Sequence, residues 1–224
     1  EIKPMVGVLP SFTQLGIASL LPNDTLSFDS SDDSVYVNNI SSRGTKNRDK
    51  ILKKTNDKSV YIDSESFLDL NKNDGREFSK ANQVIYIYHN EIDAIGDKKE
   101  SEHKVFNAVE DSFITIQKII KQISNMNGSN IFITADHGFL YQDTPTLESE
   151  FFKVEKAEDS KRFNRRFIIG STIQEVDGID IFDAKDLNIL GNEKIALAKS
   201  INKIRLQGGG NRFVHGGATL QELV

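Results

Sequence analysis

The sequence has 224 residues, of which 38% are hydrophobic, with a formal net charge of -5 at pH 7 and no cysteine. This size and apolar content predict one large or two small globular domains with a buried core, and the negative charge argues against a broad nucleic-acid-binding face. The lack of cysteine excludes disulfides and thiolate metal sites, so any metal would need His, Asp, Glu or hydroxyl ligands.

The sequence contains no apolar run near the length needed to cross a bilayer, and its first residues lack the pattern of a signal peptide. We therefore expect no membrane partner, and the lack of cysteine fits a cytoplasmic location. The chain begins on residues typical of a strand and ends inside an apparent helix, so we expect it to be a fragment of a longer protein.

The first expected unit is a strand over Met5–Leu9, a turn at Pro10, and a helix over Ser11–Leu21. Ser11 or Thr13 would lie in the first turn, where unpaired N–H groups and the helix dipole favour an anion. An ordinary helix cap is the alternative interpretation, because Ser and Thr are preferred there.

The next stretch predicts short elements separated by polar loops. Short apolar runs predict strands over 35–37 and 60–62 and a helix over 64–70, and polar composition predicts loops over 23–33 and 71–80. Residues 41–55 carry alternating basic side chains, which indicate either a basic patch or the solvated face of a helix.

The second strong strand is Gln83–Tyr88, whose β-branched and aromatic residues are typical of a central strand covered on both faces. It is followed by His89 and Asp93. An imidazole and a carboxylate four positions apart at a strand end can bind one cation if the turn brings them together.

The clearest helix lies between this strand and the next. Its apolar residues recur at spacings of three and four, at Phe106, Val109, Phe113, Ile116, Ile120 and Ile123. It ends near Asn127 and leads into an apolar run, Ile131–Thr134. This order predicts a right-handed βαβ crossover with two parallel strands.

Asp136 and His137 follow that run directly, and Gly138 then allows a turn. Ligands bind beyond the carboxyl ends of the strands in open α/β sheets, which is where this pair would lie together with His89 and Asp93. A hydrogen-bonded turn without metal is the alternative.

The C-terminal part carries the remaining candidates. A basic cluster before the expected strand Phe167–Gly170 includes Arg165 and Arg166. These two residues and Arg212 could bind phosphate, although surface solvation is the commoner fate of such side chains. His215 lies at a Gly-rich turn before an expected helix over 218–224.

Together these segments supply the ligand types of a two-metal phosphoryl-transfer site. The candidates are Thr13, His89, Asp93, Asp136, His137 and His215. A cation beside a hydroxyl lowers the pKa of that hydroxyl, so that it can attack phosphorus.

Four motifs in this order resemble those of the PglZ domain of BREX (phage growth limitation) systems, in the alkaline phosphatase superfamily. They read PSFTQLGIASLLP, VIYIYHNEIDAIGDK, NIFITADHGFLYQ and RFVHGGATLQELV. The resemblance covers residues 1–224 and implies an α/β fold with a mostly parallel central sheet flanked by helices.

The resemblance also implies residue roles. Thr13, rather than Ser11, matches the nucleophile, while Asp136, His137 and His215 match ligands of two divalent metal ions, most commonly zinc. The family's Asp-x-x-x-His pair appears here in reversed order as His89 and Asp93. A further Asp normally lies upstream of the nucleophile, so a fragment without it would bind its second metal weakly.

Two functions follow as hypotheses. The first is a metal-dependent phosphatase or phosphodiesterase acting on a phosphate ester, with nucleotides and nucleic acid among the candidate substrates. The second is a catalytically degenerate scaffold that contacts other proteins of the defence system. Zinc content and hydrolysis of a nitrophenyl phosphate ester would separate them.

Overall fold

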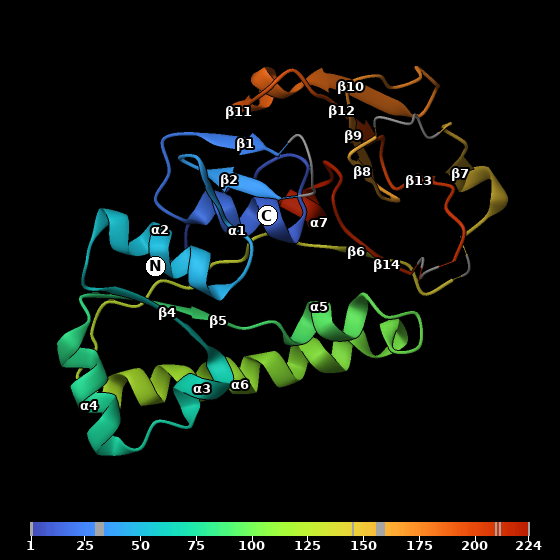
Figure 1. Ribbon diagram of the computed structural model, residues 1–224. Coiled ribbons are helices and arrows are strands. Elements are labelled where there is room, and N and C mark those ends of the chain that lie inside the picture. Colours follow the sequence, from blue (N-terminus) through green and yellow to red (C-terminus); the bar gives the residue numbers. More distant parts are fainter. Residues whose placement is uncertain are drawn as a thin grey trace.

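The computed structural model describes residues 2–29, 34–144, 146–155, 160–208, 210 and 212–223. These residues form a mixed α/β structure in which short strands alternate with helices (Figure 1). The α-helices are α1 (Thr13–Leu20), α2 (Thr45–Thr55), α3 (Ser64–Leu68), α4 (Lys72–Ala81), α5 (Glu91–Gly96), α6 (Val105–Asn125) and α7 (Leu220–Leu223). Short 3-10 turns are η1 (Glu102–Lys104), η2 (Glu148–Glu150) and η3 (Ala184–Leu187).

The strands are short. The first seven are β1 (Leu26–Phe28), β2 (Val35–Val37), β3 (Ile40–Ser41), β4 (Ser59–Asp63), β5 (Val84–Tyr88), β6 (Leu140–Tyr141) and β7 (Phe151–Phe152). The others are β8 (Arg162–Phe163), β9 (Phe167–Gly170), β10 (Ile179–Asp183), β11 (Ile189–Leu190), β12 (Lys194–Ala198), β13 (Lys203–Ile204) and β14 (Phe213–Val214).

Several small sheets take the place of the expected central sheet in the described part of the chain. Their strand orders are β11-β1-β2-β3, β10-β12-β9-β8, β13-β7, β14-β6 and β4-β5. The pairs β1–β11, β7–β13 and β4–β5 are parallel, and the other pairs are antiparallel. The described residues thus form a mixed α/β arrangement of several sheets and do not show the mostly parallel central sheet that the sequence predicts.

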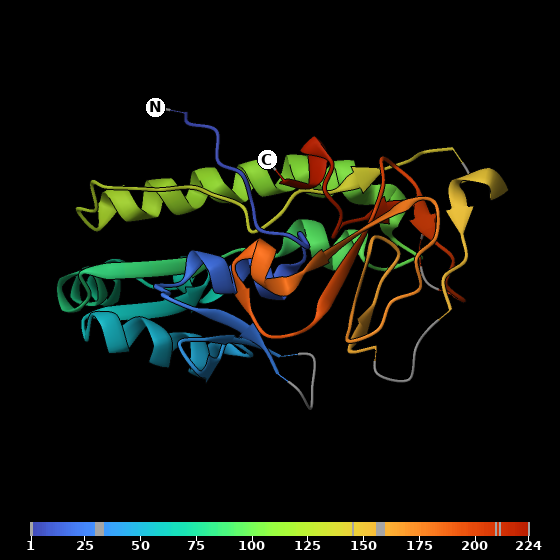
Figure 2. The same cartoon turned by 90° about the horizontal axis from the view of Figure 1, so that it is seen from above.

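The expected third parallel strand is the main difference. Residues 131–134 are irregular and lie in the segment that runs back in the direction opposite to α6 (Figure 2), and Phe132 is 94% exposed. The expected strand Met5–Leu9 is also irregular. An apolar run indicates a preference for burial, but a strand also needs a ladder of backbone hydrogen bonds. Neither run joins a sheet among the described residues, although the N–H of Gly7 donates to the carbonyl oxygen of Leu223 at 2.8 Å.

Most of the predicted helices are present in the structure. Helices α1 and α6 lie where the spacing of apolar residues predicted them, and α3 and α7 lie within the expected helices, although Val224 lies outside the described residues. Helix α2 settles the alternatives for residues 41–55, because its basic residues lie on a helix. Helix α4 was predicted as a loop. It begins where the Asn71 side chain accepts hydrogen bonds from the backbone N–H groups of Asn73 and Asp74. This cap stabilises a helix whose residues are too polar to show an apolar stripe.

The main hydrophobic core lies around α1. Buried residues of α1 share this core with residues of β1, β2, α2, β9 and β12. Phe12 stacks on Phe167 with ring centroids 4.9 Å apart. The core thus fixes the N-terminal end of α1, which carries Thr13.

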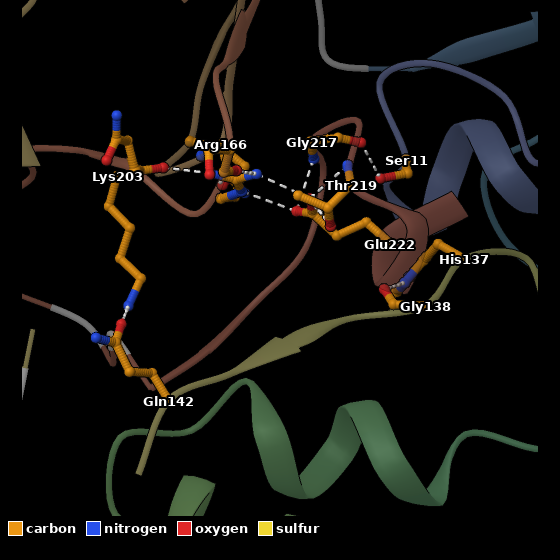
Figure 3. A network of polar contacts seen from close by, with 12 residues as sticks. Ser11, His137, Gly138, Gln142, Arg166, Lys203, Gly217, Thr219 and Glu222 are labelled. Carbon is orange, nitrogen blue, oxygen red and sulfur yellow. Dashed lines mark hydrogen bonds and ion pairs between the residues drawn. The ribbon is translucent and has the colours of Figure 1, made fainter. Parts of the chain in front are cut away.

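Lys203 in β13 is buried, and two of its hydrogen-bond acceptors are neutral. Its Nζ donates to Gln142 Oε1 at 2.7 Å (Figure 3) and to Thr146 Oγ1 at 2.8 Å. Burial disfavours the charged ammonium and lowers the pKa of Lys203 to about 8. Protonation of Lys203 therefore destabilises the folded protein relative to the unfolded chain.

We expect the free energy of unfolding to rise between about pH 8 and pH 10 relative to that of a Lys203→Met variant. In this range the unfolded chain binds the proton that folded Lys203 has lost, so folding becomes more favourable as pH rises, by up to about 3 kcal/mol. Urea unfolding of both proteins at pH 7, 8, 9 and 10 measures the difference. A constant difference would contradict the lowered pKa.

Candidate functional site

Thr13 is the first residue of α1. The preceding residue, Phe12, is the N-cap with an extended backbone, and its side chain cannot accept a hydrogen bond. The N–H groups of the first turn are therefore left for other acceptors, as in anion sites at helix N-termini. Ser11 has a different role, because its Oγ donates to the carbonyl oxygen of Gly217 at 2.7 Å in a buried contact.

The Thr13 hydroxyl contacts two of the other predicted site residues. Its Oγ1 donates to Asp93 Oδ2 at 3.3 Å and lies 3.0 Å from Nε2 of His137. His137 Nε2 and Asp93 Oδ2 are themselves 3.3 Å apart. A hydroxyl, an imidazole and a carboxylate from three distant segments thus form one cluster.

His215 extends this cluster. Its ring stacks on that of His137, with centroids 4.1 Å apart and planes at 11°. Its Nε2 lies 3.5 Å from Oδ1 of Asp97, and its Nδ1 is buried with no hydrogen-bond partner among the described residues. A buried nitrogen of this kind is costly unless another ligand occupies it.

Asp136 completes the group. Its Oδ2 lies 3.7 Å from Nε2 of His137, and its backbone packs directly against α1. A Cβ on Gly16 would come within 2.3 Å of the carbonyl oxygen of Asp136. Glycine at position 16 therefore permits the close approach that brings Asp136 to the N-terminal half of α1.

The Thr13 cluster is partly buried, and its charged groups change one another's pKa. It is defined as Thr13, Asp93, Asp97, Asp136, His137 and His215. Burial lowers the pKa of His137, but its contacts with Asp93 and Asp136 outweigh burial and raise the pKa to about 9. Burial raises the pKa of Asp136. It also tends to raise that of Asp93, although the hydrogen bond and charge of His137 give a lowered pKa. His137 therefore carries a positive charge between carboxylates.

The Asp136–Gly138 turn is held by α7. The backbone N–H of Gly138 donates to the carbonyl oxygen of Glu222 at 2.9 Å. A Cβ on Gly138 would lie 2.0 Å from the carbonyl oxygen of Gln221, so no larger residue fits without movement of α7. The glycine of this motif thus serves a close backbone approach.

A buried ion pair supports the turn that follows His215 (Figure 3). Arg166 donates through Nε to Glu222 Oε1 at 2.8 Å and through a terminal nitrogen to Oε2 at 2.9 Å, and both side chains are fully buried. The same carboxylate accepts the N–H groups of Gly217 and Thr219 at 2.9 and 3.2 Å. The pair therefore fixes the chain just after His215.

This contact gives Arg166 a protein partner in place of the phosphate that the sequence suggested. The Arg166 guanidinium also donates to the carbonyl oxygens of Ser200, at 2.7 Å, and Asn202, so it is enclosed by protein acceptors. Arg165 likewise donates to the carbonyl oxygens of Gly208 and Gly210. Neither contact lies in the Thr13 cluster.

Arg212 lies at the start of the segment that carries His215. Its side chain is 3.3 Å from Asp143 Oδ1 and is partly exposed, while its backbone N–H donates to Glu102 Oε2 at 3.1 Å. The structure thus brings none of the three predicted arginines into a contact with the Thr13 cluster among the described residues.

His89 makes contacts of its own outside the Thr13 cluster. Its Nδ1 is 3.1 Å from Ser64 Oγ, and its Nε2 is 3.2 Å from Ser112 Oγ and 3.3 Å from Glu91 Oε2. The sequence paired His89 with Asp93, but the structure pairs Asp93 with His137 instead.

The sequence reasoning did not identify Asp97, although a signal was present. Asp93 and Asp97 are four positions apart, which places their side chains on one face of α5 and its C-cap. The resemblance directed attention to an Asp-x-x-x-His spacing, and Asp97 stands where that spacing, counted from Asp93, would place the His.

The donors suit a divalent metal in chemical type. Carboxylate oxygens and imidazole nitrogens are ligands of zinc, and the buried Nδ1 of His215 offers an unused donor. Within the described ranges, no group of three or more acidic or imidazole side chains is arranged so that it could hold a metal ion. Nε2 of His137 lies 3.3 Å from Asp93 Oδ2 and 3.7 Å from Asp136 Oδ2, so these three side chains would have to rearrange to bind a metal.

The chain is similar to a known protein family along its whole length. A sequence model for PglZ, described as the BREX system PglZ alkaline phosphatase-like domain, matches residues 1–224. The alkaline phosphatase-like protein BrxZ of Escherichia coli O9:H4 (strain HS) is 37% identical over 227 residues. The alkaline phosphatase-like protein PglZ of Bacillus cereus (strain H3081.97) is 39% identical over 227 residues. Each alignment covers 100% of this chain and 26% of the relative, so the chain spans about a quarter of their length.

Proposed function

Because the chain belongs to the PglZ family of BREX alkaline phosphatase-like domains, we propose that it hydrolyses phosphate esters with Thr13 as the nucleophile. One observation supports this most strongly: the Thr13 hydroxyl lies at the start of α1, 3.0 Å from His137 Nε2 and 3.3 Å from Asp93 Oδ2. We also propose that the whole protein has the alkaline-phosphatase-like central sheet implied by its sequence motifs.

The reaction has two displacements at phosphorus. Thr13 Oγ1 attacks phosphorus and gives its proton to Asp93 Oδ2, its present hydrogen-bond acceptor. The bond from phosphorus to the leaving oxygen breaks, and its electron pair departs with that oxygen. Water then attacks phosphorus of the phosphothreonine. The bond from phosphorus to Oγ1 breaks, its electron pair returns to Oγ1, and Oγ1 takes back the proton from Asp93, so that phosphate is released and the hydroxyl restored. The N–H groups of the first turn of α1 would bind the phosphoryl oxygens.

The ligands for two divalent metal ions, most consistently zinc, would come from Asp93, Asp97, Asp136, His137 and His215. Bound cations would neutralise phosphoryl oxygens and lower the pKa of the attacking hydroxyl. The proton on His137 and the bound metal would compete for the same nitrogen, so metal binding should release a proton. The buried Nδ1 of His215 is the donor that gains most from a new partner.

For the substrate and the partners we propose classes of molecule. A phosphate ester is the substrate class, with nucleotides and nucleic acid as candidates, and other BREX proteins are the proposed partners. A scaffold role within such a complex is favoured by one observation, the lack of a ready-made metal group among the described residues. No helix in the described ranges has the length and apolarity of a membrane span.

We expect zinc-dependent hydrolysis of 4-nitrophenyl phosphate or bis(4-nitrophenyl) phosphate, lost on chelation and restored by added zinc. The His215→Ala variant should lose most of this activity, because it removes a proposed ligand. The exposed His103 provides a matched control, and His103→Ala should keep wild-type activity. Release of nitrophenolate and zinc content measure both. Zinc binding without hydrolysis of either ester would support the scaffold role instead.

A further inference from the structure

Both ring nitrogens of His89 are held by buried serines. Nδ1 lies 3.1 Å from Ser64 Oγ and Nε2 lies 3.2 Å from Ser112 Oγ. The exposed fraction is 7% for Ser64 and 3% for Ser112. Ser64 begins α3 directly after β4, and β4 pairs with β5 up to the contact of Asp63 with Tyr88. The ring therefore ties the end of β5 to the neighbouring strand and to α6.

Glu91 joins this group to α5. Its Oε2 lies 3.3 Å from His89 Nε2 and accepts from Ser112 Oγ at 3.5 Å. Glu91 is in the first turn of α5, and Ser112 is in the middle of α6. His89, Ser112 and Glu91 thus form a triangle at the point where the chain leaves β5 and enters α5.

Helix α5 depends on contacts of this kind. It has six residues, and its N-cap, Asn90, makes no side-chain capping hydrogen bond. So short a helix is not stable alone, and its orientation is set by tertiary contacts. At its other end Gly96 is pressed against Phe213, where an added Cβ would lie 2.6 Å from the ring. The angle of α5 decides where Asp93 and Asp97 point.

The buried face of α6 includes one polar residue that needs hydrogen-bond partners. It consists of Val105, Ala108, Ser112 and Ile119, so one serine replaces an apolar residue in the interior. A buried hydroxyl is unfavourable unless it is hydrogen bonded, and Ser112 satisfies this through His89 and Glu91. The contact with His89 therefore explains why a serine can be buried at position 112.

We propose that His89 is a positioning residue: by bridging Ser64 and Ser112 it fixes α5 so that Asp93 and Asp97 face Thr13, His137 and His215. The effect of His89 on catalysis rests on the proposed function, whereas its effect on the position of α5 does not. Direct ligation by His89 is the alternative that the sequence suggested. Catalysis by Ser64 or Ser112 is excluded by burial, because neither hydroxyl can reach a substrate.

The test compares His89→Ala, the double variant Ser64→Ala/Ser112→Ala, and the triple variant. The double variant keeps the imidazole and removes only its partners. Titration calorimetry with zinc should show about 10- to 100-fold weaker binding in His89→Ala and at least about 10-fold weaker binding in the double variant. The triple variant should bind zinc no more weakly than His89→Ala, because both serines act only through their contacts with His89.

The matched control is Ser42→Ala. Ser42 is also a buried serine, but its hydroxyl donates to the carbonyl oxygen of Val35, away from α5. This variant should bind zinc as the wild type does. Wild-type zinc affinity in the double variant, together with lost affinity in His89→Ala, would identify His89 as a ligand and overturn the positioning role.

Two further measurements separate this proposal from the proposed function. Hydrogen exchange of the amides of residues 91–97 in metal-free protein should be at least about 10-fold faster in the double variant than in Ser42→Ala. Unchanged exchange would overturn the proposal even if the protein hydrolyses no ester. If the wild-type protein hydrolyses esters, kcat of the double variant should be about 10- to 100-fold lower than that of the wild type, with KM nearly unchanged. The reason is that the misplaced carboxylates lie at the reacting centre.

Discussion

Replacing Thr13 by alanine should reduce kcat for nitrophenyl phosphate ester hydrolysis by at least about 1,000-fold, because no other hydroxyl can form the phosphothreonine. The Thr13→Ser variant keeps a hydroxyl on the same helix turn and should retain activity within about 10-fold of wild type. Steady-state kinetics at saturating zinc measure both variants. Circular dichroism should show both to be folded, since Thr13 is only partly buried.

Ser11 provides the control for this prediction. It is the other hydroxyl at the start of α1, but its Oγ is engaged with the carbonyl oxygen of Gly217 at 2.7 Å. Ser11→Ala should cost about 1 kcal/mol of stability through the lost hydrogen bond and leave kcat within a few-fold of wild type. Wild-type kcat in Thr13→Ala would remove Thr13 from the mechanism.

Replacing Arg166 by methionine should lower the free energy of unfolding by about 3 to 5 kcal/mol, because it leaves the Glu222 carboxylate buried without its countercharge. Burial raises the pKa of Glu222, but the Arg166 contacts and the N–H of Gly217 outweigh burial and lower it. Urea unfolding at pH 7 measures the change. Site function should also suffer, since this pair holds the turn after His215.

The controls for this prediction test whether burial is the cause. Lys199→Met removes an exposed ion pair with Asp180 and should change stability by less than about 1 kcal/mol. The double variant Arg166→Met/Glu222→Leu removes both charges and should be more stable than Arg166→Met alone. A loss of 1 kcal/mol or less in Arg166→Met would show that the pair does not hold the C-terminal segment.

The sequence was sufficient for elements whose signal is local. The spacing of apolar residues located α6, and the β-branched run located β5. The side chains of Asp136, His137 and His215 could be proposed together because each follows a strand-like run and comes just before a turn that contains glycine. Their contact in the structure shows that polar residues at such turns carry information about tertiary arrangement.

The rest depends on long-range partners that a single sequence does not show. The exposed Phe132 was expected in a strand because its apolar neighbours suggest burial, but no ladder forms there among the described residues. Arg166 looked like a surface cation within a basic cluster, and only its distance from Glu222 in space reveals a buried pair. His89 was assigned as a ligand by chemical type, whereas two serines 25 and 23 positions away hold its ring.

The most direct test of the central claim is X-ray diffraction from zinc-soaked crystals, with anomalous data collected on both sides of the zinc edge. The account predicts an anomalous peak within about 2.3 Å of side-chain atoms from both His137 and His215, beside the Thr13 hydroxyl. A map with no peak in the Thr13 cluster, or with zinc bound only elsewhere on the chain, would contradict it.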